Sequence, residues 1–425
     1  MSQKEIFKSE RIREEYIRVQ HPSGLTILLY PMKGYSSVYA IFGTHYGSTN
    51  RTFKTAADPE FVTVPDGIAH YLEHKMFESK EGDAFALFAK TGASANAFTS
   101  FDRTCYLFSC ADHFQESLEI LLSFVRDPYF TDENVQKEQG IIGQEIRMYD
   151  DNANWRVFFN LLGALYQNHP VKIDIAGTVE SIAKIDKDLL YRCYRTFYSL
   201  QNMVLAIAGN FDPDEALAIA DQLLTPDTDP QIQRSDYNEP AEIAKPEVVQ
   251  QMEVSMPLFA IGYKMEPCSG IQEVQAGIET EIVNLLLCGS GSPLYRRLYD
   301  QGLISPSFGS DTMSGFGYFC SVFEGESRNP RAVYTALNQE LERLKQEGIP
   351  KEDFENVKKA LYGDYVCSFN SVERVANGLV QAHFSGVDIY DTVEVAARVT
   401  LEDVTRRLMQ FDQNRCAISI VEPKA

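Results

Sequence analysis

The sequence predicts an α+β protein of two homologous domains, each a mainly antiparallel sheet covered by helices, joined by a linker. Three observations support this fold class. Short runs with strand-like alternation are interspersed with long amphipathic segments. A stretch rich in Pro, Asp and Glu interrupts the chain near its middle, and the same order of elements then begins again. We assign residues 1–228 to the first domain, 229–247 to the linker and 248–425 to the second domain.

The restart resembles an internal repeat. The triplet Glu-Asn-Val at 133–135 returns at 355–357, an offset of 222 residues (355 minus 133). Both copies begin a long helix that follows a helix of similar pattern. The same offset carries Glu138 and Glu145, two glutamates that are candidate metal ligands below, onto Ala360 and Cys367. If the halves are duplicates, only the first half kept a metal site.

Each predicted element has a local signal. The expected strands of the first half alternate apolar and polar residues or form short buried runs: 16–20, 24–30, 38–45, 103–110 and 202–209. The expected helices are 66–77, with Asp66 as N-cap, 82–90, 111–125 and 131–150. The segment 51–65 is expected to be a long polar loop. Gly140 and Gly143 each cost the last helix about 1 kcal/mol relative to alanine, which is tolerable if another backbone packs closely there.

The second half repeats this pattern. After the linker we expect strands at 248–254 and 259–264, a helix at 271–287, strands near 316–323 and a helical hairpin.

Composition excludes several classes of protein. The chain has 425 residues, 44% hydrophobic and 23% charged, as in globular proteins with more than one core. A net charge of -21 argues against binding to nucleic acid or to an anionic membrane. The first residues are charged throughout and lack the apolar core of a secretory signal, and the eight cysteines form no CxxC pair. We therefore expect a cytoplasmic protein with no membrane partner.

The chemistry centres on His70-Tyr-Leu-Glu73-His74. On a helix, residues four apart share a face, and the residue three along lies on the same side. One segment can therefore direct two imidazoles and a carboxylate into the same small volume. Zinc hydrolases use neutral nitrogen ligands, a third ligand from another element and a carboxylate beside the activated water. The alternative, two histidines that only pack on a surface helix, is the weaker interpretation.

The third ligand must come from a separate element. Glu138 and Glu145 lie seven residues apart on the next long helix, about 20° from eclipsed, so both face the same way. Either alone would be an ordinary solvated glutamate. Together with the histidine pair, both become candidate ligands.

These residues resemble the insulinase or pitrilysin family (M16) of zinc peptidases with an inverted motif. Residues 67–77 read like the family's motif helix. Residues 92–100 together with 103–106 resemble its "Asn-Ala-x-Thr … Thr-x-Tyr" stretch, and 138–146 resemble its second glutamate helix. The duplicated halves match the family plan, so the resemblance covers essentially the whole chain. It implies a fold like that of the processing peptidases and of LuxS, and it implies Zn²⁺ as the cofactor.

Carried over residue by residue, the resemblance implies the following roles. His70, His74 and Glu145 would bind zinc, and Glu73 would be the catalytic base. Glu138 would be a supporting carboxylate of the catalytic site. Asn96 and Ala97 would lie on an edge strand to which a substrate peptide adds as a further strand, which binds many sequences through backbone pairing.

One departure from the family bears on assembly. Active members carry, in a later domain, an arginine followed seven residues on by a tyrosine, which help to bind the substrate and the tetrahedral intermediate. Here Tyr299 stands about where the arginine should be and Ser305 where the tyrosine should be. The resemblance therefore implies a heterodimer, favoured over a homodimer, in which a homologous subunit supplies the missing pair.

Three functions remain open from the sequence. The favoured one is a zinc metalloendopeptidase subunit that acts on short or unfolded peptides in a clamshell chamber. The second is a non-catalytic, zinc-binding scaffold subunit, although such relatives usually lose the ligands and the base that are present here. The third is a zinc hydrolase that acts on a non-peptide, against which the edge-strand motif argues.

Overall fold

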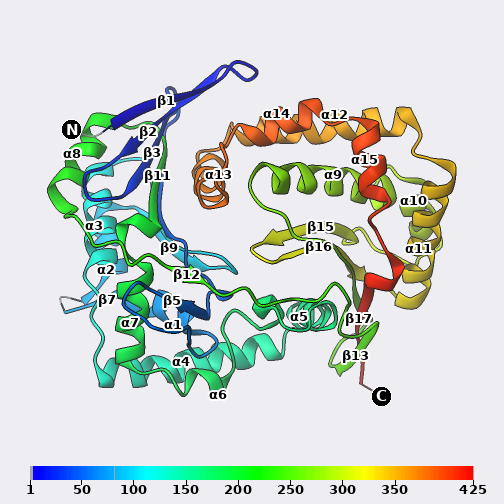
Figure 1. The fold of residues 1–425 in the computed structure, drawn as a ribbon, viewed down its shortest axis with the longest axis horizontal. Coiled ribbons are helices and arrows are strands. Elements are labelled where there is room, and N and C mark those ends of the chain that lie inside the picture. Colours follow the sequence, from blue (N-terminus) through cyan, green and yellow to red (C-terminus); the bar gives the residue numbers. More distant parts are fainter. Residues whose placement is uncertain (1–2, 81, 425) are drawn as a thin grey trace. The chain divides into compact units, whose positions relative to one another are not determined.

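The computed structural model describes residues 3–80 and 82–424, which form two compact units (Figure 1). Unit 1 takes in the chain up to Ile146 together with Asp174–Ser235 and Val366–Tyr390. Unit 2 takes in Arg147–Ile173, Asp236–Tyr365 and the chain from Asp391 on. The units thus interleave along the sequence. The linear division into 1–228, 229–247 and 248–425 stays a prediction.

Unit 1 is built on a seven-stranded sheet in the order β1-β2-β3-β11-β4-β10-β9. Only the β3–β11 pair is parallel. Every residue of β4 and β11 is buried, as expected for central strands with both faces covered. The strands are β1 (Gln3–Ser9), β2 (Glu14–Gln20), β3 (Thr26–Pro31), β4 (Val38–Thr44), β9 (Ser94–Thr99), β10 (Thr104–Cys110) and β11 (Met203–Gly209).

Helices pack on the sheet of unit 1. One of them, α13, comes from the second half of the chain and packs on β4 and β11. Another, α4, ends four residues inside unit 2. The helical elements that belong wholly or mainly to this unit are α1 (Ile68–Met76), α2 (Ala84–Thr91), α3 (Phe114–Arg126), α4 (Asp132–Asp150), α6 (Val179–Ile182), α7 (Lys187–Phe197), η2 (Leu200–Asn202), α8 (Pro213–Leu223) and α13 (Val372–Ser385).

Unit 2 has a five-stranded sheet in the order β13-β17-β14-β16-β15, with one parallel pair, β13–β17. Helix α5, from the first half of the chain, packs on β14 and β17. The strands are β13 (Glu247–Met252), β14 (Leu258–Lys264), β15 (Gly309–Gly315), β16 (Tyr318–Glu326) and β17 (Cys416–Pro423). The helical elements are α5 (Ala153–Leu165), η1 (Pro170–Lys172), α9 (Ile271–Cys288), α10 (Pro293–Asp300), α11 (Pro330–Glu347), α12 (Lys351–Ser368), α14 (Asp391–Arg398), α15 (Leu401–Leu408) and η3 (Gln413–Arg415).

The two sheets share one topology. Five strands of unit 1, β3-β11-β4-β10-β9, match β13-β17-β14-β16-β15 of unit 2 in order, and the parallel pair occupies the same place in both. The β1–β2 hairpin is the addition in unit 1. This topology confirms the predicted α+β fold of two homologous, mainly antiparallel domains.

Three local predictions were wrong. The segment 51–65 is not all loop, because β5 (Thr52–Lys54) and β6 (Val62–Thr63) form a small sheet with β12 (Gln233–Arg234), which lies in the predicted linker. Strands of two or three residues are too short to show alternation, and β12 pairs with β5 far away in the sequence, so local pattern does not reveal them. No backbone packs against Gly140 or Gly143, since a Cβ at either would meet nothing within 4 Å.

None of the helices in the described part of the chain is both long and apolar enough to cross a membrane.

The third correction concerns the start of α1. The N-cap is Gly67, in the left-handed region with φ 87°, and not Asp66. A Cβ at Gly67 would lie 2.3 Å from the carbonyl oxygen of Ala176, so only glycine fits. The Asp66 carboxylate instead pairs with Arg51 at 3.0 Å.

Candidate metal centre

Helix α1 presents both histidines and Glu73 from two successive turns. His70 and Glu73 are buried, and the imidazole rings of His70 and His74 lie 4.6 Å apart between centroids. The helix is held against α4 by Tyr71, a fully buried residue whose hydroxyl donates to the carbonyl oxygen of Val135. This contact places α4 alongside the face of α1 that carries the histidines.

The structure brings His70, His74 and Glu145 together. The carboxylate of Glu145 faces both imidazoles: Oε1 lies 3.6 Å from Nε2 of His70, and Oε2 lies 3.4 Å from Nε2 of His74. Zinc bonds of about 2.0–2.2 Å at tetrahedral angles place neighbouring ligand atoms roughly 3.3–3.6 Å apart. Among the residues that the structure describes, no other group of three His, Cys, Asp or Glu side chains converges in this way. The residues present therefore fit a zinc ion with an open fourth position.

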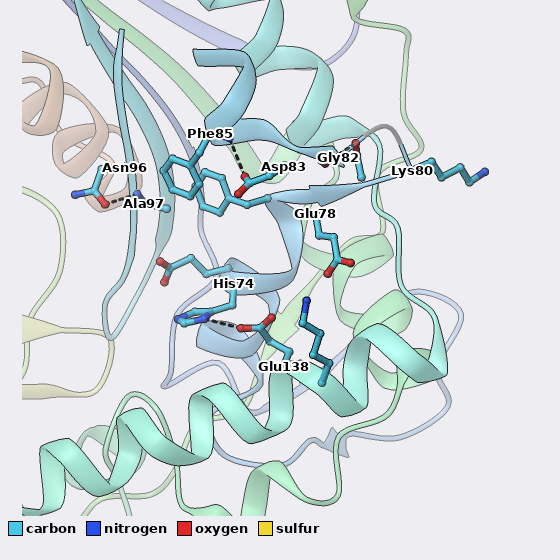
Figure 2. Close-up of a pocket in the computed structure, with 13 residues that line it drawn as sticks. His74, Glu78, Lys80, Gly82, Asp83, Phe85, Asn96, Ala97 and Glu138 are labelled. Carbon is cyan, nitrogen blue, oxygen red and sulfur yellow. Dashed lines mark hydrogen bonds and ion pairs between the residues drawn. The ribbon is translucent and has the colours of Figure 1, made fainter. Parts of the chain in front are cut away.

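Glu138 takes a different place from Glu145, although both lie on one face of α4. Its Oε1 is 3.1 Å from Nδ1 of His74 (Figure 2), whereas Glu145 faces Nε2 of the same ring. A carboxylate in this position fixes the ring orientation and leaves Nε2 as the ligand atom. Sequence spacing alone did not distinguish the two glutamates.

The electrostatics suit metal binding. Burial lowers the pKa of His70 to about 3, and the neighbouring His74 adds to this, so His70 is neutral at pH 7. Burial acts against the charged form of His74, but the hydrogen bond that its Nδ1 donates to Glu138 and the charges of Glu145 and Glu73 raise its pKa overall. For Glu138, burial is outweighed by the same hydrogen bond, and its pKa is lowered. A cation between these side chains would relieve the repulsion of their carboxylates.

Glu73 contacts the sheet of unit 1. Its Oε2 accepts a hydrogen bond of 2.6 Å from the hydroxyl of Thr99 on β9. Burial raises the pKa of Glu73, while the Thr99 hydroxyl and His74 limit the rise. Such a carboxylate is suited to proton transfer near neutral pH. The sequence placed Thr99 within a family motif but assigned it no role.

Asn96 and Ala97 lie on β9, an edge strand of the seven-stranded sheet. The Ala97 amide donates to Oδ1 of Asn96, so it faces away from β10 and toward the open edge (Figure 2). Both residues line a pocket of about 750 Å³ that also reaches Glu73. One wall of this pocket is the stacked pair Phe77–Phe85, with ring centroids 4.2 Å apart.

Among the described residues of the second half, no group of His, Cys, Asp and Glu side chains is equivalent to this centre. Ala360 and Cys367, the positions that match the glutamates of α4, lie on α12 and provide no carboxylate. Tyr299 is 49% exposed on α10, and Ser305 follows that helix.

Comparison with known proteins places these observations in a family. Residues 64–179 match the model described as Insulinase (Peptidase family M16), and residues 184–361 match the model described as Peptidase M16 inactive domain. The chain is 39% identical over 422 residues to YmfH of Bacillus subtilis (strain 168), named an uncharacterized zinc protease, with 98% of each chain covered.

Solved structures agree on the fold. A crystal structure described as an M16-like peptidase from Alicyclobacillus acidocaldarius matches with a TM-score of 0.92 and 33% identity, and it covers 100% of this chain and 99% of that one. A protease from Helicobacter pylori, 18% identical with a TM-score of 0.82 and full coverage of both chains, shares the fold. Both halves of the chain and its metal-centre motif are thus accounted for by one family, and the chain belongs to peptidase family M16, the insulinase family.

Proposed function

We propose that this chain is the zinc-bearing catalytic subunit of a metalloendopeptidase that hydrolyses short or unfolded peptides. The observation that carries the proposal is the convergence of the His70, His74 and Glu145 ligand atoms at tetrahedral spacing. Glu73 lies on the same helix as the two histidines. The names of the relatives, zinc proteases, support the same conclusion.

The chain's own residues would divide the work as follows. His70, His74 and Glu145 would hold the ion, and Glu138 would keep the His74 ring in its ligand orientation. Zinc at such a site supplies Lewis acidity that activates water and polarises a carbonyl group. Glu73 would take the proton from the attacking water and deliver it to the leaving amine.

Edge strand β9 would bind the substrate backbone. The outward-facing amide of Ala97 can donate a hydrogen bond to an added peptide strand. In the free chain this amide donates to the Asn96 side chain, which the carbonyl oxygen of the peptide would replace as acceptor. The neighbouring pocket with the Phe77–Phe85 wall would receive one substrate side chain. Backbone pairing of this kind selects extended peptides, because a folded protein offers few free strands.

We also propose that the active form is a heterodimer with a homologous subunit, in preference to a homodimer. The support is the absence from this sequence of any arginine with a tyrosine seven residues later, the pair that active relatives carry. The partner would supply that pair within a chamber formed by the two subunits. A cytoplasmic location stays a prediction that rests on the scattered cysteines.

A direct test compares the purified chain with material pulled down from its native cells. The chain alone should bind one zinc per molecule and cleave peptides poorly, and recovery of a homologue with the arginine–tyrosine pair should restore cleavage. Glu73→Gln should retain zinc and abolish cleavage.

Each other outcome has a defined meaning. Robust cleavage by the isolated chain, lost in Glu73→Gln, would refute the need for a partner. A zinc content near zero after metal-free preparation and zinc addition would favour the non-catalytic scaffold instead.

A further inference from the structure

Glu73, the proposed catalytic base, is hydrogen-bonded to the proposed substrate-binding strand β9 through a single hydroxyl, that of Thr99. Thr99 Oγ1 lies 2.6 Å from Oε2 of Glu73, and since a carboxylate can only accept, the threonine donates. A hydrogen bond to a charged carboxylate is among the stronger ones in proteins. The structure records no other side-chain hydrogen bond to Glu73 among the residues it describes, so Oε1 is the carboxylate oxygen left for substrate chemistry.

The Thr99 side chain also contacts a second threonine, on the neighbouring strand β10. It pairs across the strands with Thr104 of β10, and the two hydroxyl oxygens lie 3.2 Å apart. The Thr104 hydroxyl, which is fully buried, donates to the carbonyl oxygen of Tyr46 at 2.9 Å. Each hydroxyl has one proton, which Thr99 gives to Glu73 and Thr104 gives to Tyr46, so the two threonine oxygens are in packing contact only. This contact limits the space in which the Thr99 side chain can rotate.

The position of Thr99 along β9 connects it with substrate binding. Alternation along a strand gives Ala97 and Thr99 the same orientation, with side chains toward α1 and backbone groups toward the open edge. A peptide that pairs with this edge at Ala97 would order the strand two residues before Thr99. The free energy of backbone pairing can therefore be used to fix the base, and binding energy used in this way raises kcat more than it lowers KM.

We propose that Thr99 is a positioning residue, whose hydroxyl fixes Glu73 and couples the base to the edge strand that takes up the peptide. This inference rests on the proposed peptidase function. It extends that function by naming a residue outside the ligand set that links substrate uptake to the chemistry.

The test uses three variants in the active assembly. Thr99→Val keeps the branched shape but removes the hydroxyl, and Thr99→Ser keeps the hydroxyl. Thr63→Val is the matched control, since the Thr63 hydroxyl also contacts the hydroxyl of a threonine on a neighbouring strand, Thr52 at 2.9 Å, but lies in the small β5–β6 sheet. Zinc content and thermal melting are measured for all variants.

We expect Thr99→Val to lower kcat by roughly tenfold to a hundredfold, the range for loss of a hydrogen bond to a charged group. Its KM should stay within about twofold, and Thr99→Ser should stay within about threefold of the wild-type kcat. Zinc content should be unchanged in both. A wild-type kcat in Thr99→Val, or an equal loss in Thr99→Ser, would overturn the proposal.

A second readout does not depend on activity. Crystal structures of the two variants should show the Glu73 carboxylate in place in Thr99→Ser and displaced or disordered in Thr99→Val. If the wild-type assembly cleaves no peptide, the proposed function fails, and the position of Glu73 alone decides about Thr99. Should valine prevent folding, Thr99→Ala removes the hydroxyl without adding bulk beside Thr104 and is judged by the same criteria.

Discussion

The two glutamates of α4 offer a sharp test of the metal centre, because they share a helix face but contact different atoms of one histidine. Glu145 faces Nε2 of both imidazoles, whereas Glu138 contacts Nδ1 of His74. We therefore expect Glu145→Ala to remove a ligand and Glu138→Ala to remove only support for a ligand. Zinc affinity should fall in both variants, but much further in the first.

The magnitudes follow from the number of ligands. Structural zinc sites with four protein ligands bind with about 10–16 kcal/mol, so one ligand accounts for roughly 2.5–4 kcal/mol, or a factor of about 10² to 10³ in affinity. Loss of a carboxylate that orients a metal-bound histidine costs about tenfold to a hundredfold. Removing Glu138 should also lower the pKa of His74, because its hydrogen bond is the strongest influence that raises this pKa.

The assay is competition between metal-free protein and a chelator of known zinc affinity. Substitution with Co²⁺ provides a second readout, since its visible spectrum reports ligand number: the spectrum should change in Glu145→Ala and be retained in Glu138→Ala. Glu133→Ala, at an exposed position in the first turn of the same helix, is the control and should bind zinc as the wild type does. The reverse ranking, with Glu138→Ala the weaker binder, would refute the assignment of Glu145 as the ligand.

Three further predictions concern stability, measured by urea unfolding of zinc-free protein. Gly140→Ala should raise the free energy of unfolding by about 0.5–1 kcal/mol, because the position is an exposed helix interior with nothing near the added Cβ; a decrease would contradict this. Lys264→Met should lower it by about 3 kcal/mol, because the buried carboxylate of Glu239 loses its cationic partner and keeps only three backbone amides. Lys4→Met, at the exposed pair with Asp214, should cost less than about 1 kcal/mol. Equal losses in these two would be the contrary result. Stability should also fall from pH 6.5 toward pH 4, by up to about 1.4 kcal/mol per pH unit for each histidine whose pKa burial lowers, since the unfolded chain then binds more protons; constant stability between pH 7 and 5 would contradict this. These histidines are His45 and His70 (pKa about 3), His169 (about 4) and His383 (about 4).

Much of the arrangement of the candidate metal centre was predictable from sequence because its geometry is local. Two residues four apart on one helix must share a face, and two glutamates seven apart must do so as well. The histidine pair, the adjacent Glu73 and the carboxylate helix therefore follow from spacing alone. The α+β fold and the homologous halves were predictable for a related reason, since strand alternation, helix periodicity and the repeated triplet are properties of short segments.

Tertiary structure alone decided how these pieces face one another. Helix spacing could not distinguish Glu145 from Glu138, because their roles depend on which nitrogen of His74 each one meets, and in the sequence only the family resemblance separated them. Nor could it place the short strands β5 and β12, whose hydrogen bonds join residues far apart in the chain, or the helices α5 and α13, each of which packs on the sheet of the other half. The contact between Thr99 and Glu73 is of the same kind. Periodicity determines which residues share a face, but only the folded backbone determines what that face meets.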